Sequence, residues 1–471
     1  MEMIIAKYKN LEQYILHNLK ANDIKHRSKA SCGLWLGSLI GISAALTLLK
    51  EDNSYSELCF IIGLTGFGLI ISCLCLYIRL CIGKSPIKDF HAVYFLPSII
   101  ASMLYLLVAN KGLLTSVTWG LSVGSLGTWG VIQLMSNFPG CFTIGEATTV
   151  THGSILFLLS VVTNIPLRYH LPPIHDDDIV TIILQIGILY VLSVGGLCKN
   201  FPVLRSARCF YTVVFALFLL LAVPLLYILL DQNPITWILF YISGQRSRVT
   251  LMIYWAMCLL LSVFVLTFQV LSGVRATTAI RKYFHILAVS VYIPGILFEP
   301  TLLYLSSGII MGVFLLLEFT RILRISYLGD ILQQGFAMFV DEKDNLISLT
   351  PLYLLCGLSF PLWMPANNVP ILVLFSGVLT VGIGDTTASI VGNKWGKHKW
   401  PGLEKSMEGT LGCVVSQFAV ISIFTYLRYI DDPWLLLRSI PSAIAVSFVE
   451  SRTDQIDNLA LPLLMYVCLI I

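Results

Sequence analysis

The sequence predicts an all-α protein, a polytopic bundle of transmembrane helices, and three observations support this prediction. Only 12% of the 471 residues are charged and 57% are hydrophobic, whereas soluble domains carry about 25% charged residues. Apolar runs of about 17 to 25 residues recur along the chain, and each can cross roughly 30 Å of hydrocarbon as a helix. The alternation of about ten residues that is typical of membrane β-barrels is absent from the sequence. We therefore expect no sizeable soluble domain.

The apolar runs predict about fifteen spans. They cover residues 32–49, 56–78, 92–109, 113–134, 152–167, 179–197, 209–230, 250–271, 284–299, 302–318, 346–362, 369–387, 409–427, 434–449 and 458–471. If the basic N-terminus lies in the cytosol and the spans alternate, most of the 30 lysines and arginines fall on the cytosolic side. This asymmetry follows the positive-inside rule and supports both the orientation and the span count.

Three regions follow from this pattern. Residues 1–31 form a basic cytosolic segment without an evident cleavable signal peptide. Residues 32–271 form an N-terminal transmembrane region, and residues 272–471 form a C-terminal transmembrane region.

The twelve cysteines lie mostly in apolar runs without metal-ligand spacing, so we expect them to be small buried hydrophobes. In the N-terminal region one carboxylate, Glu146, lies among apolar and small residues. An acid inside the bilayer is costly, so Glu146 has either a functional role or a place at a helix end.

The most polar stretch of the C-terminal region, residues 382–412, lies between two apolar runs. It combines Asp385 with four lysines (Lys394, Lys397, Lys399 and Lys405), two glutamates (Glu404 and Glu408) and several glycines. A carboxylate can hold Mg²⁺, lysines can neutralise phosphate oxygens, and glycines let backbone N–H groups approach them, so the stretch suits a metal-bound polyphosphate. A basic loop without a ligand is the alternative for the lysines.

If the chain is helical after Asp385, that residue shares one face with Ala388, Ser389 and Gly392. This face could admit a ligand closely, or it could be a small-residue contact between helices. The segment Gly392–Lys397 is one residue short of a P-loop and is followed by His398, so a soluble NTPase mechanism is not supported.

Two other groups of polar residues could contribute to the chemistry. Glu450, Asp454 and Asp457 recur at helical spacing and would share one helical face, where they could bind a metal or accept a proton from an alcohol; a loop that happens to be acidic is the alternative. Arg281 and His285 lie four residues apart at the mouth of a predicted span and could bind phosphate or anchor the helix at the headgroups.

These stretches together resemble the dolichol kinase family, the CTP-dependent polyprenol kinases of the endoplasmic reticulum. RKYFH, LLLEFTR, FVDEKD, GDTTASIVGNKWGKHKWPGLEKSMEGT and TDQIDNLALPL match the family's motifs in order. The resemblance covers residues 271–471, and the N-terminal half resembles the family in length, hydropathy and the stretch CFTIGEA. Phytol kinases and phosphatidate cytidylyltransferases share the Gly-Asp core, so that core alone does not fix the substrate.

The resemblance implies a set of site residues. Asp385, Asp454 and Asp457 would be catalytic and would bind Mg²⁺ or another divalent cation. The residues implied to bind CTP are Gly392, Asn393, Lys394, Gly396, Lys397, Trp400, Pro401, Gly402, Lys405, Glu408, Gly409, Asn458, Arg281, Lys282 and His285. One acid of the Asp454 and Asp457 pair would bind the metal, and the other would accept the alcohol proton.

The implied activity is transfer of the γ-phosphoryl group of CTP to dolichol, giving dolichyl phosphate and CDP for protein glycosylation. The enzyme would be a multi-pass protein of the endoplasmic reticulum membrane with its nucleotide site facing the cytosol, and nucleic acid is not an expected partner. A lipid cytidylyltransferase and a polytopic transporter are the alternatives.

Overall fold

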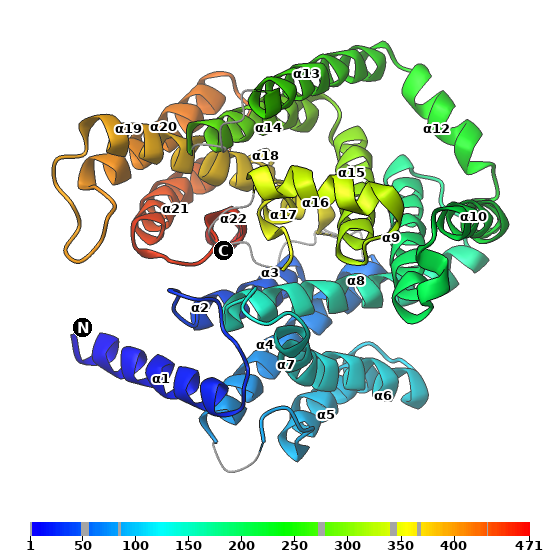
Figure 1. Ribbon diagram of the computed structural model, residues 1–471, viewed down its shortest axis with the longest axis horizontal. Coiled ribbons are helices and arrows are strands. Elements are labelled where there is room, and N and C mark those ends of the chain that lie inside the picture. Colours follow the sequence, from blue (N-terminus) through cyan, green and yellow to red (C-terminus); the bar gives the residue numbers. More distant parts are fainter. Residues whose placement is uncertain are drawn as a thin grey trace. The chain divides into compact units, whose positions relative to one another are not determined.

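The computed structural model describes residues 2–48, 56–82, 86–271, 278–339, 346–364, 369–430 and 432–471. Helices account for most of these residues (Figure 1). The one β-bridge in the described part of the chain pairs Lys399 with Ser406. The predicted all-α class is therefore confirmed.

The chain divides into two compact units. The first contains residues Met1–Thr163, Met364–Val373 and Leu437–Ile471, and the second contains Asn164–Trp363 and Leu374–Leu436. The end of the chain thus packs with its beginning, so the packing units differ from the three regions drawn along the sequence. The boundaries of those regions remain a prediction about topology.

In the first unit, α3 packs against both α4 and α22. A Cβ atom at Gly66 would lie 2.5 Å from the backbone nitrogen of Ala45, so the missing side chain lets α3 and α4 approach closely. Helix α22 is buried on nearly all sides, as its almost continuous apolar sequence predicts. The helices of this unit are α1 (Glu2–Ala21), α2 (Leu34–Gly37), α3 (Leu39–Thr47), α4 (Glu57–Cys81), η2 (Ala92–Tyr94), α5 (Phe95–Met103), η3 (Leu104–Val108), α6 (Leu113–Leu121), η4 (Ser122–Leu126), α7 (Gly127–Asn137), most of α8 (Ile144–His170), most of α18 (Ile371–Leu374), most of α21 (Pro433–Arg452) and α22 (Asp457–Ile470).

In the second unit, α9, α11 and α15 enclose an apolar core that includes Ile182, Leu229 and Leu305. A separate group of helices, α14, η7, α19 and α20, carries the polar stretch, and α19 lies beside α20 (Figure 1). The helices of this unit are α9 (Asp176–Asn200), η5 (Pro202–Arg205), α10 (Ala207–Leu217), η6 (Phe218–Ala222), α11 (Val223–Leu230), α12 (Pro234–Ser243), α13 (Arg246–Leu271), α14 (Thr278–Phe298), α15 (Pro300–Ile322), α16 (Ser326–Phe339), α17 (Leu349–Trp363), η7 (Val378–Asp385), α19 (Thr386–Trp395) and α20 (Met407–Tyr426).

Seven helices in the described part of the chain are long and apolar enough to cross a membrane. They are Glu57–Cys81, Ile144–His170, Asp176–Asn200, Ala207–Leu230, Arg246–Val265, Pro300–Ile322 and Met407–Tyr426. Shorter apolar helices occupy several of the other predicted spans, among them Lys282–Phe298, Leu349–Trp363 and Asp457–Ile470. The prediction of a helical membrane protein is confirmed, and the number of about fifteen spans remains a prediction.

Candidate functional site

Asp385 lies at the end of η7, where that helix is packed between α14 and α20 in the second unit. A Cβ atom at Gly382 would lie 2.1 Å from Cγ2 of Val289 on α14, and one at Gly384 would lie 2.9 Å from Sγ of Cys413 on α20. The two glycines before Asp385 therefore serve close helix packing. They set Asp385 in a buried position at the start of α19.

Two basic side chains from α14 surround the Asp385 carboxylate. The Lys282 ammonium group forms an ion pair with Oδ2 of Asp385, and Nδ1 of His285 lies 3.7 Å from the same oxygen. A buried carboxylate is costly unless an opposite charge compensates it, and Lys282 supplies that charge. The structure thus brings together three of the predicted site residues. The Arg281 side chain lies outside the described part of the chain.

The helix predicted to follow Asp385 is present as α19, and its small residues face α20. A Cβ atom at Gly409 would lie 2.8 Å from the carbonyl oxygen of Ala388, and one at Gly392 would lie 3.9 Å from Cα of Gly409. Ser406 caps α20 by accepting a hydrogen bond from the Gly409 N–H at 3.1 Å. Of the two interpretations of these glycines, the small-residue helix contact is the one that the geometry supports.

The segment between α19 and α20 is a short hairpin. The Trp400 N–H donates to the carbonyl oxygen of Lys405, and Nε1 of Trp400 donates to Oγ1 of Thr410 at 3.0 Å. Pro401 and Gly402 form the tip, where Gly402 has a φ of 74° and open space around it. At the base, the Glu408 carboxylate accepts hydrogen bonds from the His398 backbone and ring. The tryptophan therefore fixes the shape of the hairpin.

The lysines of this segment differ in exposure. Lys394 and Lys397 are exposed, as is Asn393, whereas Lys405 is half-buried and lies within electrostatic range of Asp385. A basic residue held near a buried carboxylate is better placed to meet a metal-bound phosphate than one that projects into solvent. Lys405 is therefore the strongest phosphate-binding candidate of the hairpin.

The acidic segment near the end of the chain belongs to the first unit, and here one expectation is wrong. Helix α21 ends at Arg452 and α22 begins at Asp457, so Glu450, Asp454 and Asp457 do not share one helical face. The Gln455 N–H donates to Oγ1 of Thr453 at 3.2 Å, and this local side-chain bond competes with continuation of the helix.

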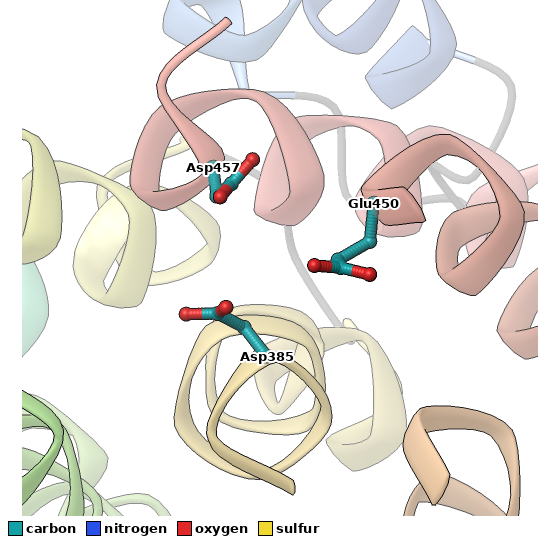
Figure 2. Close-up of side chains that lie close together, drawn as sticks. All are labelled: Asp385, Glu450 and Asp457. Atoms are coloured by element: carbon teal, nitrogen blue, oxygen red, sulfur yellow. The ribbon is translucent and has the colours of Figure 1, made fainter. Parts of the chain in front are cut away.

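Glu450 and Asp457 still come together across this turn. A carboxylate oxygen of each lies within 4.8 Å of the other (Figure 2), and both are carboxylates of the type that Mg²⁺ prefers as ligands. Figure 2 also labels Asp385, which belongs to the second unit. Glu450 is thus a candidate ligand that the implied set of residues did not contain.

Asp454 has different partners. Its carboxylate accepts hydrogen bonds from the backbone N–H and the hydroxyl of Ser31, both at 2.7 Å, and from Nε2 of Gln455 at 2.8 Å. Burial opposes ionisation of this carboxyl, but the hydrogen bonds from Ser31 and Gln455 outweigh it, so the pKa of Asp454 is lowered. The geometry gives Asp454 a structural role in joining the N-terminal segment to the turn before α22. Neighbouring Asn458 is buried in the first turn of α22.

The N-terminal half contributes a buried ion pair to the same turn. Glu146 is fully buried and lies 2.7 Å from the Arg27 guanidinium. Thr143 and Glu146 also form a capping box at the start of α8, because the Glu146 N–H donates to Oγ1 of Thr143 and the Thr143 N–H donates to Oε2 of Glu146. The sequence Thr-x-x-Glu is a recognisable signal for this box, but nothing local identifies Arg27 as its partner.

Comparisons with known proteins agree with the resemblance. A sequence model described as dolichol kinase matches residues 129–351. Dolichol kinase of Homo sapiens is 32% identical over 357 residues, which cover 71% of this chain and 66% of the human protein, and the mouse protein gives the same shares over 359 residues. Dolichol kinase EVAN of Arabidopsis thaliana is 30% identical over 403 residues, which cover 76% of this chain and 70% of the plant protein. The chain therefore spans just under two thirds of the two mammalian relatives. No solved structure matches it.

Proposed function

Because the chain belongs to the dolichol kinase family, we propose that it transfers the γ-phosphoryl group of CTP to the hydroxyl of dolichol. The bond between the γ-phosphorus and the β,γ-bridging oxygen breaks, a bond to the dolichol oxygen forms, and the hydroxyl proton passes to a base; the products are dolichyl phosphate and CDP. The observation that carries the proposal is Asp385, a buried carboxylate paired with Lys282 at the start of the motif that resembles the family's nucleotide segment.

The proposal gives each described residue a role. Glu450 and Asp457, which lie together in the first unit, would hold Mg²⁺, and a bound Mg²⁺ would neutralise charge on the β- and γ-phosphates. Asp385 is proposed as a metal ligand on the family resemblance alone. Lys405 and Lys282 would add positive charge around the same oxygens. Phosphoryl transfer needs alignment and charge stabilisation more than covalent chemistry from the protein, and these residues supply both.

The sequence alone leaves two candidates, Asp454 and Asp457, for the carboxylate that accepts the alcohol proton. The carboxylate of Asp454 already accepts three hydrogen bonds from Ser31 and Gln455, which lowers its basicity. Asp454 is therefore a poor base, and because Asp457 is assigned to the metal, we give the proton-accepting role to neither acid.

The acceptor's isoprenoid tail suits a membrane-embedded enzyme, since the tail can stay in the bilayer while the hydroxyl reaches the interface. We place the enzyme in the endoplasmic reticulum membrane with its nucleotide segment facing the cytosol. The concentration of lysines and arginines on one side of the predicted spans supports this orientation.

The test is to follow two labels of CTP with the purified protein and dolichol. The proposed reaction moves a γ-label into the lipid and leaves an α-label in water-soluble CDP. Transfer of the α-label to the lipid would instead identify a lipid cytidylyltransferase. No dolichol-dependent consumption of CTP would remove the kinase assignment and favour a transporter.

A further inference from the structure

The Arg27–Glu146 ion pair is almost fully buried. Both residues lie far from the predicted nucleotide segment in the sequence. The side chains of Arg27 and Glu146 are only 5% and 0% exposed, and their charged atoms are 2.7 Å apart. Burying two charges is expensive, and a pair of this kind adds little net stability compared with apolar residues of similar size. Its presence therefore calls for a role other than stability.

Both partners of the pair reach the turn that precedes Asp457. Oε1 of Glu146 accepts a hydrogen bond from the Ile456 N–H at 3.1 Å, and Nη2 of Arg27 donates to the carbonyl oxygen of Asp454 at 3.1 Å. The two bonds hold the backbone on either side of Gln455. They fix the chain direction immediately before the first residue of α22.

A second set of contacts holds Gln455 itself. Oγ1 of Thr143 donates to Oε1 of Gln455 at 2.6 Å, and Nε2 of Gln455 donates to the carbonyl oxygen of Ser31 at 3.2 Å. At Gly33 a Cβ atom would lie 2.3 Å from Oε1 of Gln455. The Gln455 side chain is thus enclosed by residues from the two segments that also carry Arg27 and Glu146.

The Ile456 N–H needs a hydrogen-bond acceptor because Ile456 is the N-cap residue of α22. In a capping box this N–H is satisfied by a glutamate or glutamine three residues later in the same helix. Here the third helical residue is Leu459, so Glu146 on α8 supplies the carboxylate instead. The start of α22, and with it the direction of Asp457, is fixed from another helix.

We propose that the Arg27–Glu146 pair is a positioning device for the proposed metal ligand Asp457. The proposal rests on the proposed function, because it concerns the same site. Arg27 and Glu146 do not touch the phosphates; they act through the backbone of residues 454–456. Outer groups that orient metal ligands commonly change metal affinity by about 10- to 100-fold when they are removed.

The experiment compares Glu146→Gln with the natural protein, both purified in detergent, and dolichol is added only for the transfer assay. Binding of Mn²⁺ is measured by electron paramagnetic resonance without substrate, and the Mg²⁺ concentration that gives half-maximal transfer is measured separately. We expect the Mn²⁺ dissociation constant and the half-maximal Mg²⁺ concentration each to rise by about tenfold or more. The matched control is Glu299→Gln, which alters the part-buried Arg248–Glu299 ion pair of the other unit and should leave both values unchanged.

A merely structural role for the pair would lower the amount of folded protein and leave the Mn²⁺ affinity of the remaining protein unchanged, and this result would overturn the proposal. If Glu146→Gln does not fold, the double variant Arg27→Met with Glu146→Leu removes both charges and avoids leaving one of them alone. It should fold and still bind Mn²⁺ more weakly; unchanged affinity in the folded double variant would again contradict the proposal.

The variant Asp457→Asn separates this proposal from the proposed function. Loss of γ-label transfer in Asp457→Asn, together with unchanged Mn²⁺ binding in Glu146→Gln, would reject the positioning role alone. Full transfer in Asp457→Asn would instead reject the catalytic assignment on which both depend.

Discussion

Oε1 of Glu146 accepts a hydrogen bond from the backbone nitrogen of Ile456, 310 residues further along the chain. A stretch that the family resemblance marked only weakly, CFTIGEA, thereby contacts the residue directly before Asp457. The N-terminal half of the protein therefore forms part of the surroundings of the acidic segment.

Replacement of Asp385 by Asn should abolish most transfer while the protein still folds. The amide keeps the size of the side chain but loses the charge that pairs with Lys282 and would bind the cation. We expect γ-label transfer to fall by more than about 100-fold at an unchanged level of membrane-inserted protein. The control is Asp330→Asn on the exposed face of α16. Near-normal turnover in Asp385→Asn would exclude Asp385 as a principal ligand.

Lys405→Ala should mainly weaken binding of CTP. The half-buried ammonium group lies within electrostatic range of Asp385, where it would meet the phosphates. We expect KM for CTP to rise by about tenfold, since a charge-assisted hydrogen bond contributes about 1.5 to 3 kcal/mol. Steady-state kinetics over a range of CTP concentrations measures this, with exposed Lys199→Ala as the control. An unchanged KM would remove Lys405 from the site.

Gly409→Ala should destabilise the pair of helices that carries the nucleotide segment. The added methyl group would lie 2.8 Å from the carbonyl oxygen of Ala388 and would force α19 and α20 apart. We expect a loss of about 1–3 kcal/mol in unfolding free energy, seen as a lower Tm. In Gly187→Ala on α9 the new methyl group meets nothing within 4 Å, so this control should be neutral or slightly stabilising. Equal Tm values for the two variants would show that α19 and α20 can accommodate the added methyl group.

Glu12→Gln should stabilise the protein at neutral pH and less so in acid. Burial raises the pKa of Glu12, so the folded protein holds the proton more tightly than the unfolded chain does. The stability that protonation provides is lost as the pH rises through the raised pKa, and the charged carboxylate then lowers stability. The neutral amide avoids this loss. Tm measured against pH for both proteins tests the prediction; a difference in Tm that grows toward acid pH would contradict it.

Local sequence patterns predicted the helix that follows Asp385, whereas the roles of the residues around it remain predictions. Helix α19 follows Asp385 as the spacing of small residues indicated, and the basic residues Lys282 and His285 of the RKYFH stretch lie beside it. These features depend on periodicity within one helix or on motifs that the family shares. Glycines in the same stretch were harder to interpret, because close helix packing and close approach of a phosphate both favour glycine.

The acidic segment shows where local reasoning fails. Its spacing fits one helical face, yet the chain turns between Arg452 and Asp457, and Asp454 bonds to Ser31, 423 residues away. A partner so remote in sequence leaves no periodic signal. The spacing indicated Glu450 as a possible metal ligand, although the set implied by the family resemblance did not contain it, and Glu450 lies beside Asp457. Glu146 could be identified as a residue at a helix end but not as the partner of Arg27.

The packing of α22 within the first unit has a consequence for biogenesis. Arg27 and Glu146 leave the ribosome long before residues 454–456, and at roughly 5–20 residues per second the interval for 310 residues is on the order of 15–60 seconds. During that time the nascent chain carries its early helices in the membrane without their final neighbour. This unit is therefore completed late in synthesis, and a premature stop codon before α22 would leave the early helices of the unit without this neighbour.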